Sequence, residues 1–108
     1  MANGFYIGTD LKFKIEIKAA GFDMENDNFS IQLRNGDKTI DVPDDNIVSD
    51  SDGNYYLLVS TSELKSGPLT MIVTAEVPDD DFPENSEEFL PSKRREVEKI
   101  NLCTIKVV

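Results

Sequence analysis

The chain of 108 residues lacks histidine and tryptophan and contains a single cysteine. Without histidine, no serine or cysteine nucleophile can be paired with an imidazole base, which removes the commonest hydrolase arrangement. Zinc sites are built mainly from histidine and cysteine, so no zinc site is expected. Cys103 has no intrachain disulfide partner, which favours folding in a reducing compartment, and its place in an apolar strand indicates a small core residue. We therefore expect no enzyme, no metal site and no cofactor.

Long apolar runs are also missing. No stretch approaches the about 20 apolar residues that cross a bilayer, and the N-terminus lacks the basic and then apolar pattern of a secretory signal. The net charge of −10 repels polyphosphate and anionic lipid, so neither nucleic acid nor a membrane is an expected partner. Residues 21–92 hold 17 of the 21 acidic residues. This unevenness allows a head-to-tail electrostatic contact between copies, although a plain solvated surface is the simpler interpretation.

What the sequence does have is apolar and polar residues alternating with a period of two, most clearly over residues 11–18. This period places the two sets on opposite faces of a strand. Residues 55–60 are apolar on both faces and are expected near the middle of a sheet. Strands are expected at about 5–8, 11–18, 29–34, 37–42, 55–60, 69–77 and 95–108.

Turn signals separate these runs. Asn35-Gly36 predicts a type I′ hairpin turn, and residues 50–53 predict a second turn. Residues 61–67 have room for one helical turn that ends at Gly67. In the last strand the apolar positions change parity, which requires a bulge or a change of sheet near Asn101.

Seven to eight short strands predict an all-β fold, an antiparallel β-sandwich of immunoglobulin-like type, with a small barrel as the alternative. A chain of this length is one domain, residues 1–108. Its least regular part is an acidic, proline-containing loop at about 78–92, long enough to suggest a functional or mobile segment.

Acidic clusters are the first place to look for chemistry. Asp79, Asp80 and Asp81 are adjacent, but neighbouring carboxylates in an extended loop point apart, whereas calcium needs six or more converging oxygens. Residues 50–53 resemble part of a calcium loop but place valine at both end positions that need carboxylates. A β-turn is the better interpretation there, and a solvated acidic loop is the default for residues 79–81.

Two further groups invite a binding role. Lys93, Arg94 and Arg95 follow the acidic loop and are suited to clamping an acidic partner surface or a second copy, although a solubilising flank is simpler. The three tyrosines, at positions 6, 55 and 56, are the aromatic residues left for stacking on sugar rings. A carbohydrate- or cell-surface-binding module is therefore the alternative function.

Two segments together resemble a known family. Residues 6–12, Tyr-Ile-Gly-Thr-Asp-Leu-Lys, and residues 77–83, Val-Pro-Asp-Asp-Asp-Phe-Pro, followed by basic residues and Glu96-Val97, are similar to small structural proteins of prophages and tailed phages of gut bacteria. The likeness extends along almost the whole chain, but residues 84–93 are longer and more acidic than the usual short turn. It implies a virion protein, assembled in the bacterial cytoplasm, that attaches fibres or decorates the capsid or tail surface.

Such a protein acts by contact with other capsid, tail or fibre subunits and with copies of itself. The first strand, near residues 5–7, is either an arm that pairs with a neighbour or an ordinary strand of its own sheet, with the ordinary strand slightly favoured. The expected partner-contact residues are Phe5, Tyr6, Ile7, Asp79, Asp80, Asp81, Phe82, Arg94 and Arg95.

Overall fold

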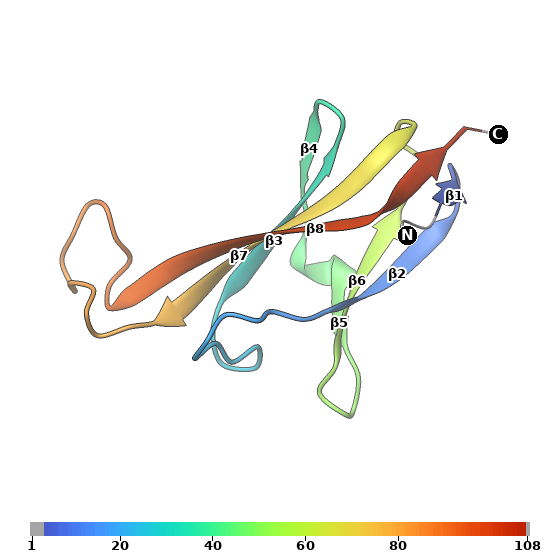
Figure 1. The fold of residues 1–108 in the computed structure, drawn as a ribbon. Coiled ribbons are helices and arrows are strands. Elements are labelled where there is room, and N and C mark those ends of the chain that lie inside the picture. Colours follow the sequence, from blue (N-terminus) through green and yellow to red (C-terminus); the bar gives the residue numbers. More distant parts are fainter. Residues whose placement is uncertain (1–3, 108) are drawn as a thin grey trace.

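The protein is described by a computed structural model that covers residues 4–107, and these residues form eight strands and one short 3-10 helix, η1 (Figure 1). No helix in the part described is long and apolar enough to span a membrane. The strands are β1 (Gly4–Tyr6), β2 (Asp10–Ile15), β3 (Phe29–Asn35), β4 (Lys38–Asp41), β5 (Ile47–Ser49), β6 (Tyr55–Ser60), β7 (Gly67–Pro78) and β8 (Lys93–Lys106), and η1 is Asp44–Asn46.

The strands form two sheets. One has five strands in the order β1-β8-β7-β3-β4, and the other has three in the order β2-β6-β5. This confirms an all-β, sandwich-like fold in place of the barrel alternative. The expectation of purely antiparallel sheets is wrong, because β1 runs parallel to β8 through Gly4–Thr104, Phe5–Ile105 and Tyr6–Lys106.

Alternation explains the core between the sheets. In β7 every odd-numbered residue from Leu69 to Val77 is buried, and in β3 the buried residues are Ile31, Leu33 and Asn35. The three-stranded sheet contributes Leu57 and Val59 among others. β6 lies between β2 and β5, as its apolar character on both faces predicted. Cys103 is a free, buried core residue, and burial raises the pKa of its thiol.

Several boundaries differ from the sequence prediction. β2 ends at Ile15, and residues 16–20 continue outside any strand of the two sheets. The backbone N–H of Lys18 donates to the Glu98 carboxylate at 3.3 Å, so this segment runs beside the inner face of β8. Strand β5 and helix η1 were not predicted, because residues 44–49 contain only one short apolar pair.

The first hairpin turn is displaced by one residue from the prediction. Asn35 pairs with Lys38 in the ladder, so the two central turn residues are Gly36 and Asp37. Only Gly36 has a positive φ, 62°, which fits a type II′ turn and not the expected I′. Asn35 is instead a buried strand residue, whose side chain accepts from Lys65 N–H at 2.8 Å and donates to two carbonyls, those of Lys65 and Pro68.

The parity change in the last strand is confirmed as a β-bulge. Leu69 lies opposite Cys103 while Thr70 lies opposite Asn101, so Leu102 is the extra residue. Because of the bulge, the apolar residues before and after it point to the same face of the sheet. Cys103 and Ile105, after the bulge, face the core, and so does Ile100, before the bulge, which pairs with the buried Met71.

The helical turn expected over residues 61–67 is absent, and residues 61–66 form a non-helical turn instead. Leu64 N–H donates to the Thr61 carbonyl at 3.1 Å, and Gly67, with a φ of 126°, begins β7. Thr61 is fully buried. Its hydroxyl accepts from Gly8 N–H at 2.9 Å and donates to the Thr9 carbonyl at 2.6 Å, which fixes the crossing of the chain from one sheet to the other.

Candidate contact surfaces

The end of the β7–β8 hairpin is the most prominent projection of the molecule (Figure 1). β3 pairs with β7 only as far as Ala75, so the last residues of β7, the first of β8 and the connecting residues 79–92 lie beyond it. We call residues 79–92 the hairpin tip. Its ends are joined where Asp79 N–H donates to the Ser92 carbonyl at 2.9 Å, next to the Pro78–Lys93 pair.

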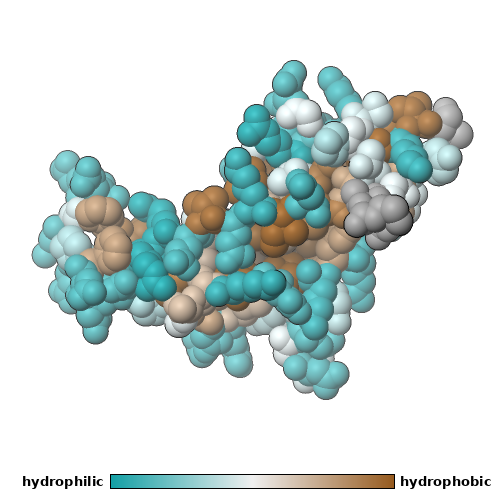
Figure 2. All heavy atoms as spheres, in the orientation of Figure 1, coloured by the Kyte–Doolittle hydropathy of each residue, from teal (hydrophilic) through white to brown (hydrophobic). Residues whose placement is uncertain are grey.

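The tip contains its own aromatic pair. The rings of Phe82 and Phe89 meet edge to face, with their centroids 5.2 Å apart, and Phe89 is 44% exposed. Around them are six acidic residues and no basic one. Apolar side chains are visible among hydrophilic ones at this end of the molecule (Figure 2). An exposed aromatic residue within an acidic rim is an arrangement suited to anchoring a partner.

The basic cluster predicted at residues 93–95 forms its contacts within the chain, mainly with residues of the same hairpin. Arg94 bonds the Asp79 carboxylate at 2.9 Å and the Ala20 carbonyl at 2.8 Å, so it ties the tip to the segment that follows β2. Arg95 donates to the Glu88 carbonyl at 3.3 Å, and Lys93 lies 3.7 Å from Glu76. Among the predicted contact residues, Asp79, Phe82, Arg94 and Arg95 are therefore brought together at the tip and its base, with Asp80 and Asp81 exposed beside them.

Phe5, Tyr6 and Ile7 lie at the opposite end of β8. Phe5 pairs with Ile105 and packs against the core, and Ile7 N–H donates to the Lys106 carbonyl at 2.9 Å. The first strand is thus an ordinary edge strand of its own sheet, and its pairing with β8 is satisfied within the chain. Tyr6 is 54% exposed, and the Lys106 ammonium lies 5.9 Å from its ring centroid.

A second surface was not predicted: the outer face of the five-stranded sheet, on the side away from the core. The ladder places the even-numbered residues of β3 and β7 on this face, together with their β8 partners. Of the acidic residues in these five strands, only Asp41 and Glu76 lie on this outer face. We call this surface the basic face, because five basic residues lie on it: Arg34, Lys93, Arg95, Lys99 and Lys106.

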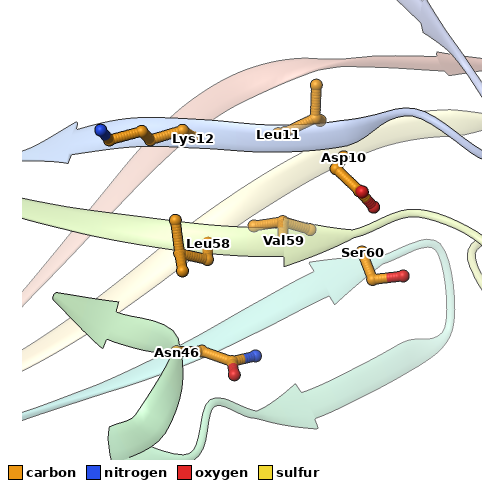
Figure 3. Close-up of a pocket in the computed structure, with 7 residues that line it drawn as sticks. All are labelled: Asp10, Leu11, Lys12, Asn46, Leu58, Val59 and Ser60. Atoms are coloured by element: carbon orange, nitrogen blue, oxygen red, sulfur yellow. The ribbon is translucent and has the colours of Figure 1, made fainter.

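A pocket of about 360 Å³ lies beside β2 and β6, lined by seven residues (Figure 3). Leu11 and Val59 are core residues, and Asp10, Lys12 and Ser60 supply the polar groups on the two strands. Within residues 4–107 no group of three or more His, Cys, Asp or Glu side chains is placed to hold a metal ion. The pocket contains one carboxylate and one amine, and no pair of carboxylates for acid–base catalysis.

The acidic turn at residues 50–54 is a structural feature. The Asp50 carboxylate accepts from the backbone N–H groups of Asp52 and Asn54 and from the side chains of Asn54 and Tyr56. The Asn54 N–H in particular lowers the pKa of Asp50 below its ordinary 3.8. The β-turn interpretation of residues 50–53 is confirmed, since Gly53 N–H also donates to the Asp50 carbonyl.

The tyrosines do not form one stacking platform. Tyr55 packs edge to face on Phe29, with ring centroids 6.4 Å apart, and it belongs to the packing around the core. Tyr56 is on the opposite face of β6, where the Lys12 ammonium lies 4.4 Å from its ring centroid. Tyr6 is in the other sheet.

Comparisons with known proteins identify no relative of this chain. No protein-family model matches this chain, and neither a curated protein nor a solved structure is significantly similar to it.

Proposed function

We propose that this protein is a non-enzymatic structural component of a tailed-phage particle, an adaptor or decoration domain that acts through protein–protein contacts. The observation that carries the proposal is the hairpin tip, where an exposed Phe89 packs on Phe82 within an acidic rim at the end of a projecting hairpin. The Arg94–Asp79 ion pair and backbone hydrogen bonds across the base close the tip, and these contacts reduce the freedom of the segment that carries this aromatic residue. Preorganised aromatic anchors are typical of binding hot spots.

The phage context is supported by the resemblance of residues 6–12 and 77–83 to small virion proteins. Residues 77–83 end β7 and open the tip, so this resemblance falls on the element proposed to make contact. Residues 6–12 contain the crossing from β1 to β2 that Thr61 fixes.

We also propose that the fold is immunoglobulin-like. The last two strands pair with each other and with β3 and β4, while β2, β6 and β5 form the second sheet. This order corresponds to the variable-type arrangement, in which the sheet of strands C, F and G gains strand C′. Here β3, β7 and β8 take the places of C, F and G, and β4 takes that of C′. The short parallel β1 then corresponds to a first strand that joins the sheet of the last strand.

Quantitative mass spectrometry of gradient-purified particles, produced by a host that carries the gene, tests the proposal. We expect the protein at a fixed copy number relative to the major capsid protein. Phe89→Ala should lower this copy number at least about tenfold, with folding checked by circular dichroism. Absence of the protein from particles, together with glycan binding by the monomer, would support the carbohydrate-binding alternative instead.

A further inference from the structure

We propose that the hairpin tip of one copy docks on the basic face of a second copy. This inference rests on the proposed role of the tip as a contact element, and it names the partner of that element. It does not depend on the phage particle, and it is testable with the purified protein.

The basic face is chemically distinct from the rest of the molecule. It carries five basic and two acidic side chains on a protein with a net charge of −10. Glu76 is engaged by Lys93, and Asp41 accepts from Gln32 at 2.8 Å. Arg34 and Lys99 take part in no ion pair within residues 4–107, so their charges are available to a partner.

The same face has an apolar centre. Val97 is 60% exposed and lies between Arg95 and Lys99 along β8, and its ladder partner is Thr74. Ile72, the ladder partner of Lys99, is half-buried beside it. An apolar centre flanked by basic side chains matches an aromatic residue flanked by carboxylates.

The hairpin tip has the complementary chemistry. Asp79 is neutralised by Arg94, but Asp80, Asp81, Glu84, Glu87 and Glu88 are exposed and have no ion-pair partner among the described residues. Phe89 supplies the apolar contact for Val97. Four of the five basic residues of the basic face lie on β8, and the tip extends away from this face at the far end of the β7–β8 hairpin, so the contact is between two molecules (Figure 1).

Other occupants fit less well. A polyanion such as nucleic acid would match the basic side chains of this face, but its phosphates would offer no apolar contact to the exposed Val97 at the centre. The basic residues of the other sheet are already engaged, Lys12 over the Tyr56 ring and Lys14 with Glu16 at 3.6 Å. The basic face is therefore the better surface for an acidic tip, and the tip of another copy is present wherever the protein is.

Sedimentation velocity on the purified full chain tests the contact with two charge-reversal variants. Glu84→Lys/Glu87→Lys changes the tip, and Arg34→Glu/Lys99→Glu changes the basic face. All four side chains are exposed and form no hydrogen bond or ion pair within residues 4–107, so both variants are expected to fold. Matched controls reverse the same number of charges elsewhere: Glu25→Lys/Glu63→Lys and Lys18→Glu/Lys65→Glu.

We expect the native mass to rise above that of the 12.1 kDa monomer with concentration at low ionic strength. Raising the salt from about 0.01 M to about 1 M, which shortens the Debye length from about 30 Å to about 3 Å, should weaken association at least about tenfold. Each contact variant alone should weaken it at least about tenfold, each control should stay within about twofold of the native chain, and mixing the two contact variants should restore it.

A protein that stays monomeric at every concentration and salt overturns the inference, and so does association that survives both contact variants. Loss of association in the mixture as well would also contradict it, because the mixture restores every charge pairing. Particle incorporation separates the two proposals. If the protein is monomeric but present in particles, only the proposed contact between copies is contradicted. If it self-associates but is absent from particles, only the proposed virion function is contradicted.

Discussion

At the scale of single residues, buried polar side chains fix the parts of the backbone that the sheets leave without partners. Thr61 and Asn35 are nearly inaccessible, at 0% and 1%, and both bond backbone groups of distant segments. Asn35 holds the connection to β7, and Thr61 holds the crossing between β1 and β2. Neither role was visible in the sequence, because a threonine or asparagine near a turn is ordinarily a cap or a turn residue.

Thr61→Val should lower the free energy of unfolding by about 1–3 kcal/mol, because it leaves the Gly8 N–H and the Thr9 carbonyl without their partner. Urea unfolding followed by circular dichroism measures the loss. Thr61→Ser keeps the hydroxyl and should lose less than the valine variant. Equal stability of Thr61→Val and the native chain would contradict the assigned role.

Stability should also depend on pH through Asp50. Hydrogen bonds, chiefly from Asn54 N–H, lower its folded pKa below the unfolded value of 3.8. Its contribution is therefore complete above the unfolded pKa and is lost as the pH falls through the folded pKa. NMR titration of the carboxyl carbon should place its midpoint below 3.8, and Asp50→Asn should make the urea midpoint fall less steeply on acidification. An unchanged slope would rule out this contribution.

At the scale of elements, the β7–β8 hairpin separates folding from contact. The inward-facing side chains of its two strands belong to the core between the sheets. The tip instead has its own aromatic pair and its own backbone hydrogen bonds across the base. The expected loop boundaries were close to the observed residues 79–92. The Phe82–Phe89 contact could not be predicted, since it depends on how the loop doubles back between Pro83 and Ser92.

Replacing residues 80–91 with Asn-Gly should leave the fold intact. Asp79 and Ser92 already face each other, so a two-residue turn can join them. The shorter loop favours folding by about 1.5 kcal/mol, which offsets the lost aromatic contact, worth about 0.5–1.5 kcal/mol. We expect the unfolding free energy to change by less than about 1 kcal/mol while self-association is lost. A variant that unfolds would show that the tip supports the core.

The charged residues of β8 should prevent its free edge from pairing with the edge of another molecule. β1 covers only residues 104–106, and the edge from Lys93 to Cys103 is flanked by Glu96 and Glu98 on the inner face and by the bulge at Leu102. Charged residues and bulges of this kind oppose pairing between edges. Glu96→Val/Glu98→Val should aggregate faster than the matched loop variant Glu25→Val/Glu63→Val, as measured by turbidity at equal concentration. Equal rates would mean that the edge needs no protection.

At the scale of the whole molecule, charge is separated by structural class. Nine of the 11 basic residues lie in strands, and 16 of the 21 acidic residues lie outside them. Long basic side chains cover sheet surfaces with their aliphatic stems, whereas aspartate favours turns. The net charge of −10 therefore belongs to the loops, and the sheet faces remain available to an acidic partner.

The two sheets should unfold together, because their buried side chains form one core cluster. Ile15→Val in the three-stranded sheet and Ile105→Val in the five-stranded sheet should each cost about 0.5–1.5 kcal/mol. Tyrosine fluorescence in a Tyr6→Phe background, which leaves Tyr55 and Tyr56 of β6 as the reporters, and amide exchange in β7 should give the same loss for both variants. A loss confined to the sheet that carries the substitution would indicate two independent units.

The sequence by itself determined which side is buried in the clearly alternating strands β2, β3 and β7 and where β8 must bulge, because alternation and parity follow from the local geometry of an extended chain. Only the tertiary structure decided which strands are neighbours, that β1 runs parallel to β8, and that Arg34 and Lys99 share one face. A single strand's pattern specifies its own two sides. It does not identify the strand that lies beside it, since pairing between strands distant in the chain depends on how all of them bury their apolar faces together.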